Sequence, residues 1–111
     1  MSEFAERLKA INRQVIEREK NPNIEEWKKE QKEHIIYMKD EILDDFEWAA
    51  SIGNLKEQEF SFWGEESSNI PNAEAITREL AEEVLKPYGI KVEQVLLKHG
   101  GDEISITCRI E

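Results

Sequence analysis

Apolar residues between positions 24 and 51 recur with a period of eleven, and this pattern constrains the fold more than any other feature of the chain. The positions are Ile24, Trp27, Ile35, Met38, Ile42, Phe46 and Ala49. Gln31 occupies the one remaining slot of the repeat. Eleven residues over three turns keep a stripe nearly straight along an α-helix. We therefore expect one long helix over residues 24–51, ended by Gly53 and Asn54, which tolerate a left-handed cap.

The two halves of this helix differ in the width of their apolar face. After residue 35 a second apolar row appears, at Ile36, Leu43 and Ala50. The first half instead has a narrow apolar seam among charged residues. We expect the second half to lie against the body of the protein, and the first half to project, covered by the preceding helix or by a partner chain.

A shorter amphipathic helix is expected over residues 2–20. Its apolar residues lie four, three and four apart, at Phe4, Leu8, Ile11 and Val15. Ser2 is a suitable N-cap. Asn21-Pro22-Asn23 then breaks the helix, because proline disfavours helical geometry in the residue before it. So short a linker predicts that the two helices pack as an antiparallel hairpin.

The C-terminal half alternates between strand and helix patterns. Residues 56–63 place Phe60 and Phe62 in the alternation of a strand. A helix is expected from near Asn72 to Lys86-Pro87. The last segment reads as a β-hairpin with Gly100-Gly101 at its tip, a pair suited to a two-residue turn.

That turn fixes a register that can be checked. The expected pairs are His99 with Asp102, Lys98 with Glu103, Leu97 with Ile104, and Val95 with Ile106. Continued without interruption, the ladder would place charged Glu93 opposite Cys108. A β-bulge near Glu93-Gln94 avoids this, because it restores Val92 opposite Cys108 and Ile90 opposite Ile110. We therefore predict a bulge at this point.

The expected order is α-α-β-α-β-β, an α+β fold in which helices cover one face of a small antiparallel sheet. The chain of 111 residues suits a single domain. Within it, residues 1–52 form the helical hairpin and residues 55–111 the β-α-β-β portion.

Charge and cysteine content narrow the function classes. The chain has 15 Lys and Arg against 25 Asp and Glu, a formal charge of -10. Direct nucleic-acid binding is not expected, because it depends on cationic side chains that neutralise phosphates. Apolar runs are too short for a membrane span. A single cysteine, Cys108, favours a reducing compartment, so we expect a cytoplasmic protein.

Residues that could do chemistry do not converge in the sequence. Cys108 lies in the inward row of the last strand, which predicts a buried hydrophobe rather than a nucleophile. His99 is expected far from it, at the hairpin tip. Glu30 and His34 lie four apart on one helix, but two ligands do not make a zinc site.

Two carboxylate pairs, Glu30 with Glu33 and Glu41 with Asp44, resemble the magnesium site of the all-helical nucleotide pyrophosphohydrolases. In that family the two pairs come from helices that face each other. Here both pairs lie along one helix, and Glu33 is about 12 Å of helical rise from Glu41. That separation is too great for one metal cluster. We therefore expect no enzyme activity, no metal and no cofactor.

The distinctive feature that remains is acidic surface. Candidate partner-binding residues on the long helix are Asp40, Glu41, Asp44, Asp45, Glu47 and Trp48. A second group comprises Glu65, Glu66, Glu79, Glu82 and Glu83. Carboxylates spaced along a helix can imitate a run of phosphates and speed association with a basic groove. The sequence thus favours a small acidic protein that binds a basic partner protein and inhibits or masks it. A nucleic-acid enzyme is the expected partner, as for phage anti-defence inhibitors and nuclease-immunity proteins.

The alternative is an assembly module. In that case the helical hairpin forms a homodimer through a seam of Ile24, Trp27 and Ile35. A merely soluble acidic domain is also compatible with the composition. Trp27, Trp48 and Trp63 are the aromatic residues that could anchor a partner.

Overall fold

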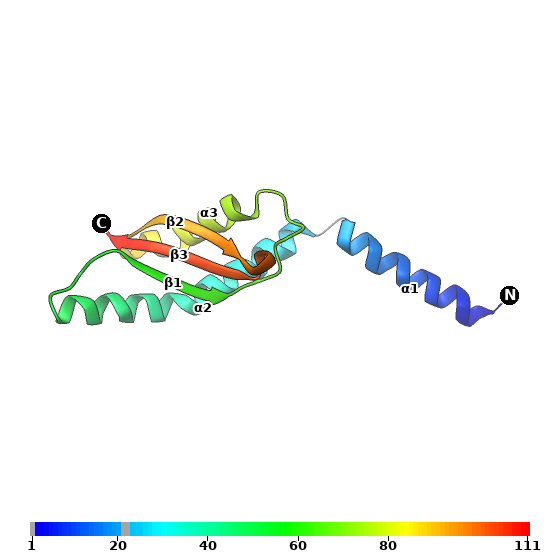
Figure 1. Ribbon diagram of the computed structural model, residues 1–111, viewed down its shortest axis with the longest axis horizontal. Helices are drawn as coiled ribbons and strands as arrows, with labels where there is room; N and C mark the ends of the chain where they lie inside the picture. Colours follow the sequence, from blue (N-terminus) through cyan, green and yellow to red (C-terminus); the bar gives the residue numbers. More distant parts are fainter. Residues whose placement is uncertain (1, 21–22) are drawn as a thin grey trace.

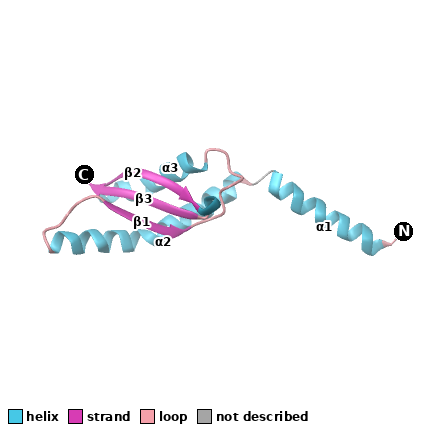
Figure 2. Ribbon diagram, viewed as in Figure 1, coloured by secondary structure: helices cyan, strands magenta, loops and turns pink. Residues whose placement is uncertain are grey.

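The computed structural model confirms the α+β class and the order of elements (Figures 1 and 2). It describes the backbone of residues 2–20 and 23–111, and the side chains of residues 2–13 and 23–111. The helices are α1 (Glu3–Lys20), α2 (Ile24–Ser51) and α3 (Ala73–Leu85), with the 3-10 turns η1 (Lys86–Tyr88) and η2 (His99–Gly101). The strands are β1 (Gln58–Trp63), β2 (Ile90–Lys98) and β3 (Glu103–Ile110).

Capping residues determine where α2 begins and ends. The Glu26 backbone N–H donates to the Asn23 side chain at 3.1 Å, which satisfies one free donor of the first turn. At the other end, Gly53 has a φ of 71°. The Gly53 N–H donates to the Ala50 carbonyl at 3.1 Å and the Asn54 N–H to the Ala49 carbonyl at 2.8 Å. This Schellman arrangement confirms that Gly53 and Asn54 end the helix.

The sheet has the strand order β1-β3-β2, and all its pairs are antiparallel. The predicted bulge is confirmed: the register shifts between Val92 and Gln94, so that Val92 pairs with Cys108 and Ile90 with Ile110. Helices α2 and α3 lie on one face of this sheet (Figure 1). Their buried residues pack against the sheet in one core, formed by Ile35, Ile42, Phe46, Leu80, Leu85, Phe60, Phe62, Val92, Val95, Ile104, Ile106 and Cys108.

The hairpin connection differs from the expected two-residue turn. Strands β2 and β3 end at the pair Lys98–Glu103, so four residues form the connection. His99, Gly100 and Gly101 all have positive φ values. A Cβ on Gly101 would lie 2.9 Å from the Ser68 backbone nitrogen. The tip therefore packs against the loop before α3, and this contact requires a wider connection than a free hairpin. The expected pairing of His99 with Asp102 is wrong, because His99 Nε2 lies 3.0 Å from Glu103 Oε2.

Helix α1 does not pack on α2 as the short linker predicted. Among the described residues, α1 makes no contact with another element, and Figure 1 shows it extending away from the sheet and the other helices. Asn21 and Pro22, where the break was predicted, lie outside the described residues. On α2, Trp27 and Ile35 of the first half are buried against other parts of the chain, which include α3 and the loop before it.

The expectation that the first half of α2 projects is therefore wrong. Trp27 is 6% exposed and Ile35 is fully buried within the chain. Trp27 packs with Ile70 and Ala73, and its indole Nε1–H donates to Ser67 Oγ at 3.1 Å. Trp27 and Ile35 of the proposed dimer seam are thus buried in the core of one chain. Of that seam, only Ile24 is exposed and able to contact a second copy.

Gln31, the polar residue in the apolar repeat, is fully buried, and both its side-chain nitrogen and its side-chain oxygen are hydrogen-bonded. Its side-chain nitrogen donates to Thr77 Oγ1 on α3 at 3.2 Å. Its oxygen accepts from the Glu65 backbone N–H at 2.9 Å. The Thr77 hydroxyl in turn donates to the Ala73 carbonyl at 2.7 Å. One amide therefore joins α2, α3 and the loop after β1.

Replacing Gln31 by Met tests this junction. The volume is nearly retained, but the Glu65 N–H loses its acceptor in a buried place, so we expect the free energy of unfolding to fall by about 1–3 kcal/mol. The same replacement at exposed Gln94 is the control, with an expected change within about 0.5 kcal/mol. Urea unfolding followed by circular dichroism measures both. Equal effects at the two positions would contradict the assigned role of Gln31.

Candidate partner-binding surface

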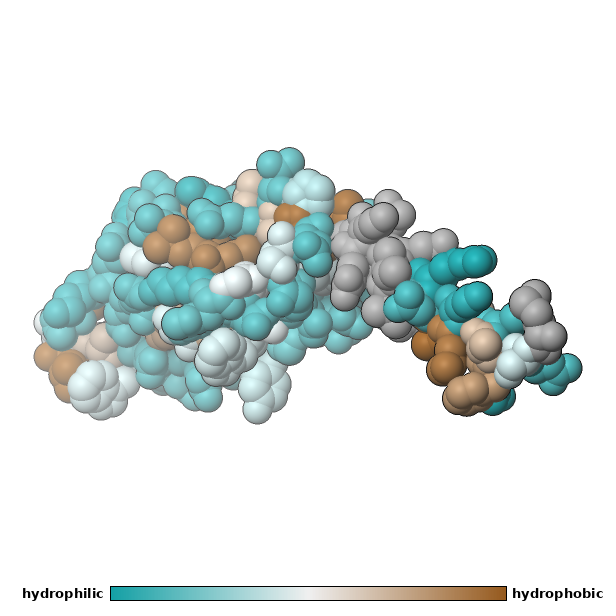
Figure 3. Space-filling model, turned by 45° about the vertical axis from the view of Figure 1, so that its right-hand side comes forward, coloured by the Kyte–Doolittle hydropathy of each residue, from teal (hydrophilic) through white to brown (hydrophobic). Residues whose placement is uncertain are grey.

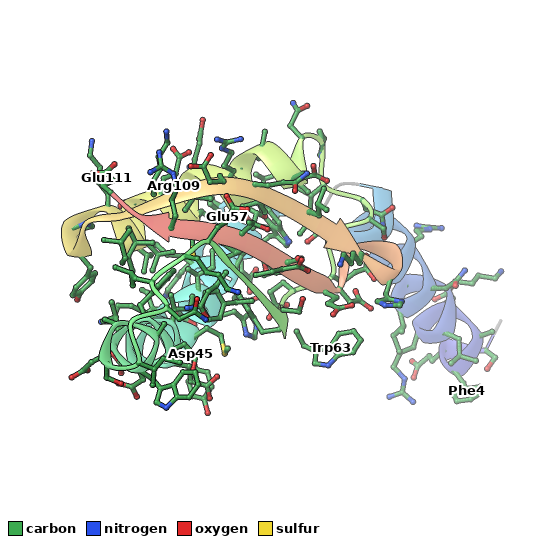
Figure 4. All side chains as sticks on the ribbon, turned by 60° about the vertical axis from the view of Figure 1, so that its left-hand side comes forward. Phe4, Asp45, Glu57, Trp63, Arg109 and Glu111 are labelled. Carbon is green, nitrogen blue, oxygen red and sulfur yellow. The ribbon has the colours of Figure 1, made fainter. Side chains whose placement is uncertain are left out.

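The acidic row of α2, defined as Asp40, Glu41, Asp44, Asp45 and Glu47, is exposed at every position. The apolar residues between them are buried, with Ile42 fully inside and Phe46 at 4%. The helical period separates the two sets, because positions three and four apart share a face. In Figure 4 the side chain of Asp45 lies on the side of α2 away from the sheet. The row therefore points outward, as the sequence predicted.

Few cations neutralise this row. Among the residues whose side chains are described, the ion pair that reaches it joins Lys39 Nζ and Asp40 Oδ1 at 3.9 Å. The last turn of α2 contains no basic residue. Among the described residues, the row is therefore left with little compensating positive charge.

Two exposed aromatic side chains flank the acidic row. Tyr37 is 81% exposed and Trp48 is 66% exposed. They are eleven residues apart, so they lie on nearly the same side of the helix. Sequence reasoning had selected Trp48 but missed Tyr37. The signal was present, because the eleven-residue period that marks the buried stripe also aligns these two residues on the opposite face.

The second acidic group comprises Glu65, Glu66, Glu79, Glu82 and Glu83, and most of these side chains contact other residues of this chain. Glu82 contacts Arg78 at 3.0 Å on α3. Glu83 contacts Lys32 of α2 at 2.8 Å, and this hydrogen bond lowers the pKa of Glu83. Glu79 is exposed on α3. The Glu83–Lys32 contact places these acids on the flank of α2 that faces α3, so they do not extend the acidic row.

Glu65 and Glu66 belong to the loop between β1 and α3. Glu65 Oε1 lies 2.8 Å from His34 Nε2. The negative charge of Glu65 also raises the pKa of Glu30. Glu66 Oε1 accepts from the Ser68 backbone N–H at 2.7 Å. Both carboxylates therefore help to hold the loop, and we remove them from the candidate surface.

The loop and the hairpin tip meet at a pair of carboxyl groups. Hydrogen bonds from Ser68 lower the pKa of Glu66, whereas the hydrogen bond to Glu66 raises the pKa of Asp102. Asp102 Oδ1 is buried and has no hydrogen-bond partner among the described residues. The negative charge of Glu66 also contributes to the raised pKa of Asp102, because two charged carboxylates repel each other.

The residues considered for catalysis lie apart. Cys108 is fully buried in the core, and burial raises the pKa of its thiol to about 12, helped by the charge of Glu57. This confirms the predicted buried hydrophobe. His34 and His99 contact Glu65 and Glu103 instead. The four carboxylates that resemble the pyrophosphohydrolase site all lie on the single helix α2.

The side chains described, those of residues 2–13 and 23–111, include no group of three or more His, Cys, Asp or Glu arranged to hold a metal ion. In the same part of the chain, none of the helices has an apolar stretch long enough to span a membrane.

Comparisons of the chain with models of protein families, with curated proteins and with solved structures found no match. The candidate surface therefore stands on the geometry of this chain: an exposed acidic row, few neutralising cations, and an aromatic side chain at each end.

The Glu66–Asp102 pair predicts a pH-dependent effect of replacing Asp102 by Asn. A raised pKa in the folded state means that Asp102 stabilises the fold below its unfolded pKa and loses this contribution as pH rises through the folded value. An amide at this position can donate to Glu66 at any pH. We therefore expect Asp102→Asn to increase stability relative to the native chain at neutral pH, and the gain to shrink near pH 4, about the ordinary carboxyl pKa.

Urea unfolding of the native chain and of Asp102→Asn at the two pH values measures this difference in the free energy of unfolding. Glu74→Gln, which also removes one carboxyl group but at an exposed position on α3, is the control. A gain from Asp102→Asn that is the same at both pH values would contradict the raised pKa of Asp102.

Proposed function

We propose that this chain is a non-enzymatic protein that binds a basic partner protein through the acidic row of α2 and thereby inhibits or masks it. The observation that supports this most directly is the combination of exposure and missing neutralisation in the row. Exposed carboxylates with few neighbouring cations gain little stability from the folded chain. Their contribution is better explained by an interaction outside the chain.

The density of charge along the row suits a surface that normally binds nucleic acid. Five carboxylates lie within the eight residues from Asp40 to Glu47. At about 1.5 Å of rise per residue this is about one charge per 2.4 Å, against about one per 1.7 Å along duplex DNA. Asp40, Asp44 and Glu47 follow one line of the helix, and Glu41 and Asp45 lie about 100° round from it. A groove lined by Lys and Arg would meet this band of negative charge. We therefore favour a nucleic-acid-binding enzyme as the partner.

Such a partner is consistent with an inhibitor of the phage anti-defence type or with a nuclease-immunity protein. Both need tight and rapid binding rather than turnover, and complementary charge increases the rate of association. A cytoplasmic location is part of the same proposal, because a single free cysteine suits a reducing compartment. The burial of Cys108, with its high thiol pKa, supports the absence of thiol catalysis.

Neutralising the acidic row tests the proposal. The triple variant Asp40→Asn, Asp44→Asn, Glu47→Gln should lose capture of the partner from a host lysate at low salt, whereas the native chain captures it. Duplex DNA and added salt should both release the captured protein, because the contact is electrostatic.

A triple variant at Glu57, Glu74 and Glu111, each changed to Gln, is the matched control. These residues are also exposed, so the net charge changes equally while the row stays intact. Capture that survives in the first variant, or that fails equally in both, would refute the row as the binding surface.

Trp48 provides a second test at one end of the row. Tryptophans that a partner buries on binding commonly contribute about 2 kcal/mol or more, which is about thirtyfold in affinity. We expect Trp48→Ala to weaken binding of the captured partner by this amount and to leave the free energy of unfolding within about 0.5 kcal/mol of the native value.

Trp63→Ala is the matched control, because Trp63 is 67% exposed and Trp48 is 66% exposed. In Figure 4 Trp63 lies at the end of β1, away from the helix that holds Asp45. Calorimetric titration of the two variants gives the comparison. Equal losses of affinity would mean that the partner does not dock specifically on the row.

A further inference from the structure

Helix α1 presents an apolar stripe that remains uncovered in the described structure. Phe4, Leu8 and Ile11 are 61%, 50% and 51% exposed, and Figure 3 shows an apolar patch on this helix. An isolated helix of 18 residues is only marginally stable in water. Most helices in proteins are stabilised by packing of their apolar face. The stripe on α1 therefore needs a surface to pack against.

The spacing of the stripe suits a partner helix. Phe4, Leu8 and Ile11 lie four and three residues apart, which is the spacing of a coiled-coil seam. We infer that the partner is α1 of a second copy of this chain, packed antiparallel. In a register where facing positions sum to nineteen, Leu8 of each copy lies opposite Ile11 of the other. The seam is then complementary to itself, as a two-fold axis requires.

The distribution of charge favours the same arrangement. Residues 2–20 hold five basic and four acidic residues, whereas residues 21–111 hold ten basic and 21 acidic residues. Two copies therefore repel each other everywhere except along α1, which is nearly neutral. Because the acidic portion follows the C-terminus of α1, antiparallel pairing places the two acidic portions at opposite ends. Parallel pairing would place them side by side.

The dimer should be weak. The seam has only three described apolar residues per helix, so it buries much less than the roughly 1,200 Å² of a stable interface. A dissociation constant in the micromolar range or above is expected. This inference does not depend on the proposed function, because the acidic row of α2 takes no part in the seam.

Sedimentation velocity of the full chain over a wide range of concentration tests the pairing. The native chain should pass from monomer to dimer as its concentration rises. Leu8→Gln should weaken the dimer about a hundredfold or more, because each dimer loses two buried leucine side chains. Lys9→Gln is the matched control on another face of α1 and should leave the equilibrium unchanged.

Spin labels test the orientation of the two helices. Cysteines are introduced singly at Glu3 and at Ala10, and the native Cys108 stays unlabelled because it is fully buried. At about 1.5 Å of rise per residue, the two copies of residue 3 lie about 20 Å apart along an antiparallel pair, whereas the two copies of residue 10 are nearly level. Equal distances at both positions would indicate parallel helices and overturn the proposed register.

Two other results would overturn the inference itself. One is a native chain that stays monomeric at every concentration. The other is a Leu8→Gln variant that dimerises as the native chain does. Vesicles of zwitterionic and anionic lipid are included as a separate arm. A monomeric chain that sediments with the vesicles, and loses this binding in Leu8→Gln, would show that a lipid surface covers α1 instead.

Discussion

The buried amide of Gln31 is the interaction on which the arrangement of the domain depends. It joins α2 to α3 through Thr77 and to the loop after β1 through the backbone of Glu65. A Cβ on Gly64, the residue before Glu65, would lie 2.7 Å from the Gln31 oxygen and 2.4 Å from Ile104. The loop therefore approaches the core as closely as its backbone allows. A buried amide with satisfied partners specifies one arrangement, because other arrangements would leave its polar atoms without partners.

The same helix that provides this junction also presents the acidic row. A repeat close to the natural period of the α-helix keeps the buried stripe straight, and it leaves the acidic row on the exposed part of the helix surface. The buried stripe fixes α2 against the sheet through Ile35, Ile42 and Phe46. The acidic row is thereby held on a rigid element. Preorganised charge binds a partner with less loss of conformational entropy than charge on a flexible loop.

Local patterns in the sequence predicted much of the fold. Periodicity gave α2 and α3, and the mismatch between Glu93 and Cys108 was sufficient to place the bulge. The burial of Cys108 followed from the same alternation. The packing of α1 and of the first half of α2 was not predictable in this way. Both depend on the loop before α3, where Ser67 and Ile70 cover Trp27, and contacts between distant segments leave no periodic signal. The outward direction of the acidic row was predictable, whereas the internal use of Glu65 and Glu66 was not.

The bulge in β2 also affects one of the two edges of the sheet, the edge that β2 forms. An uninterrupted edge strand exposes a row of amide and carbonyl groups that can pair with a strand of another molecule and begin aggregation. Here the ladder shifts at Val92 and Gln94, and Arg78 of α3 donates to the Val92 carbonyl at 3.4 Å. The twist of the bulge and this side chain together make the edge a poor template for growth of an ordered fibre. Protection of this kind persists in high salt, where mutual repulsion between acidic molecules no longer keeps them apart.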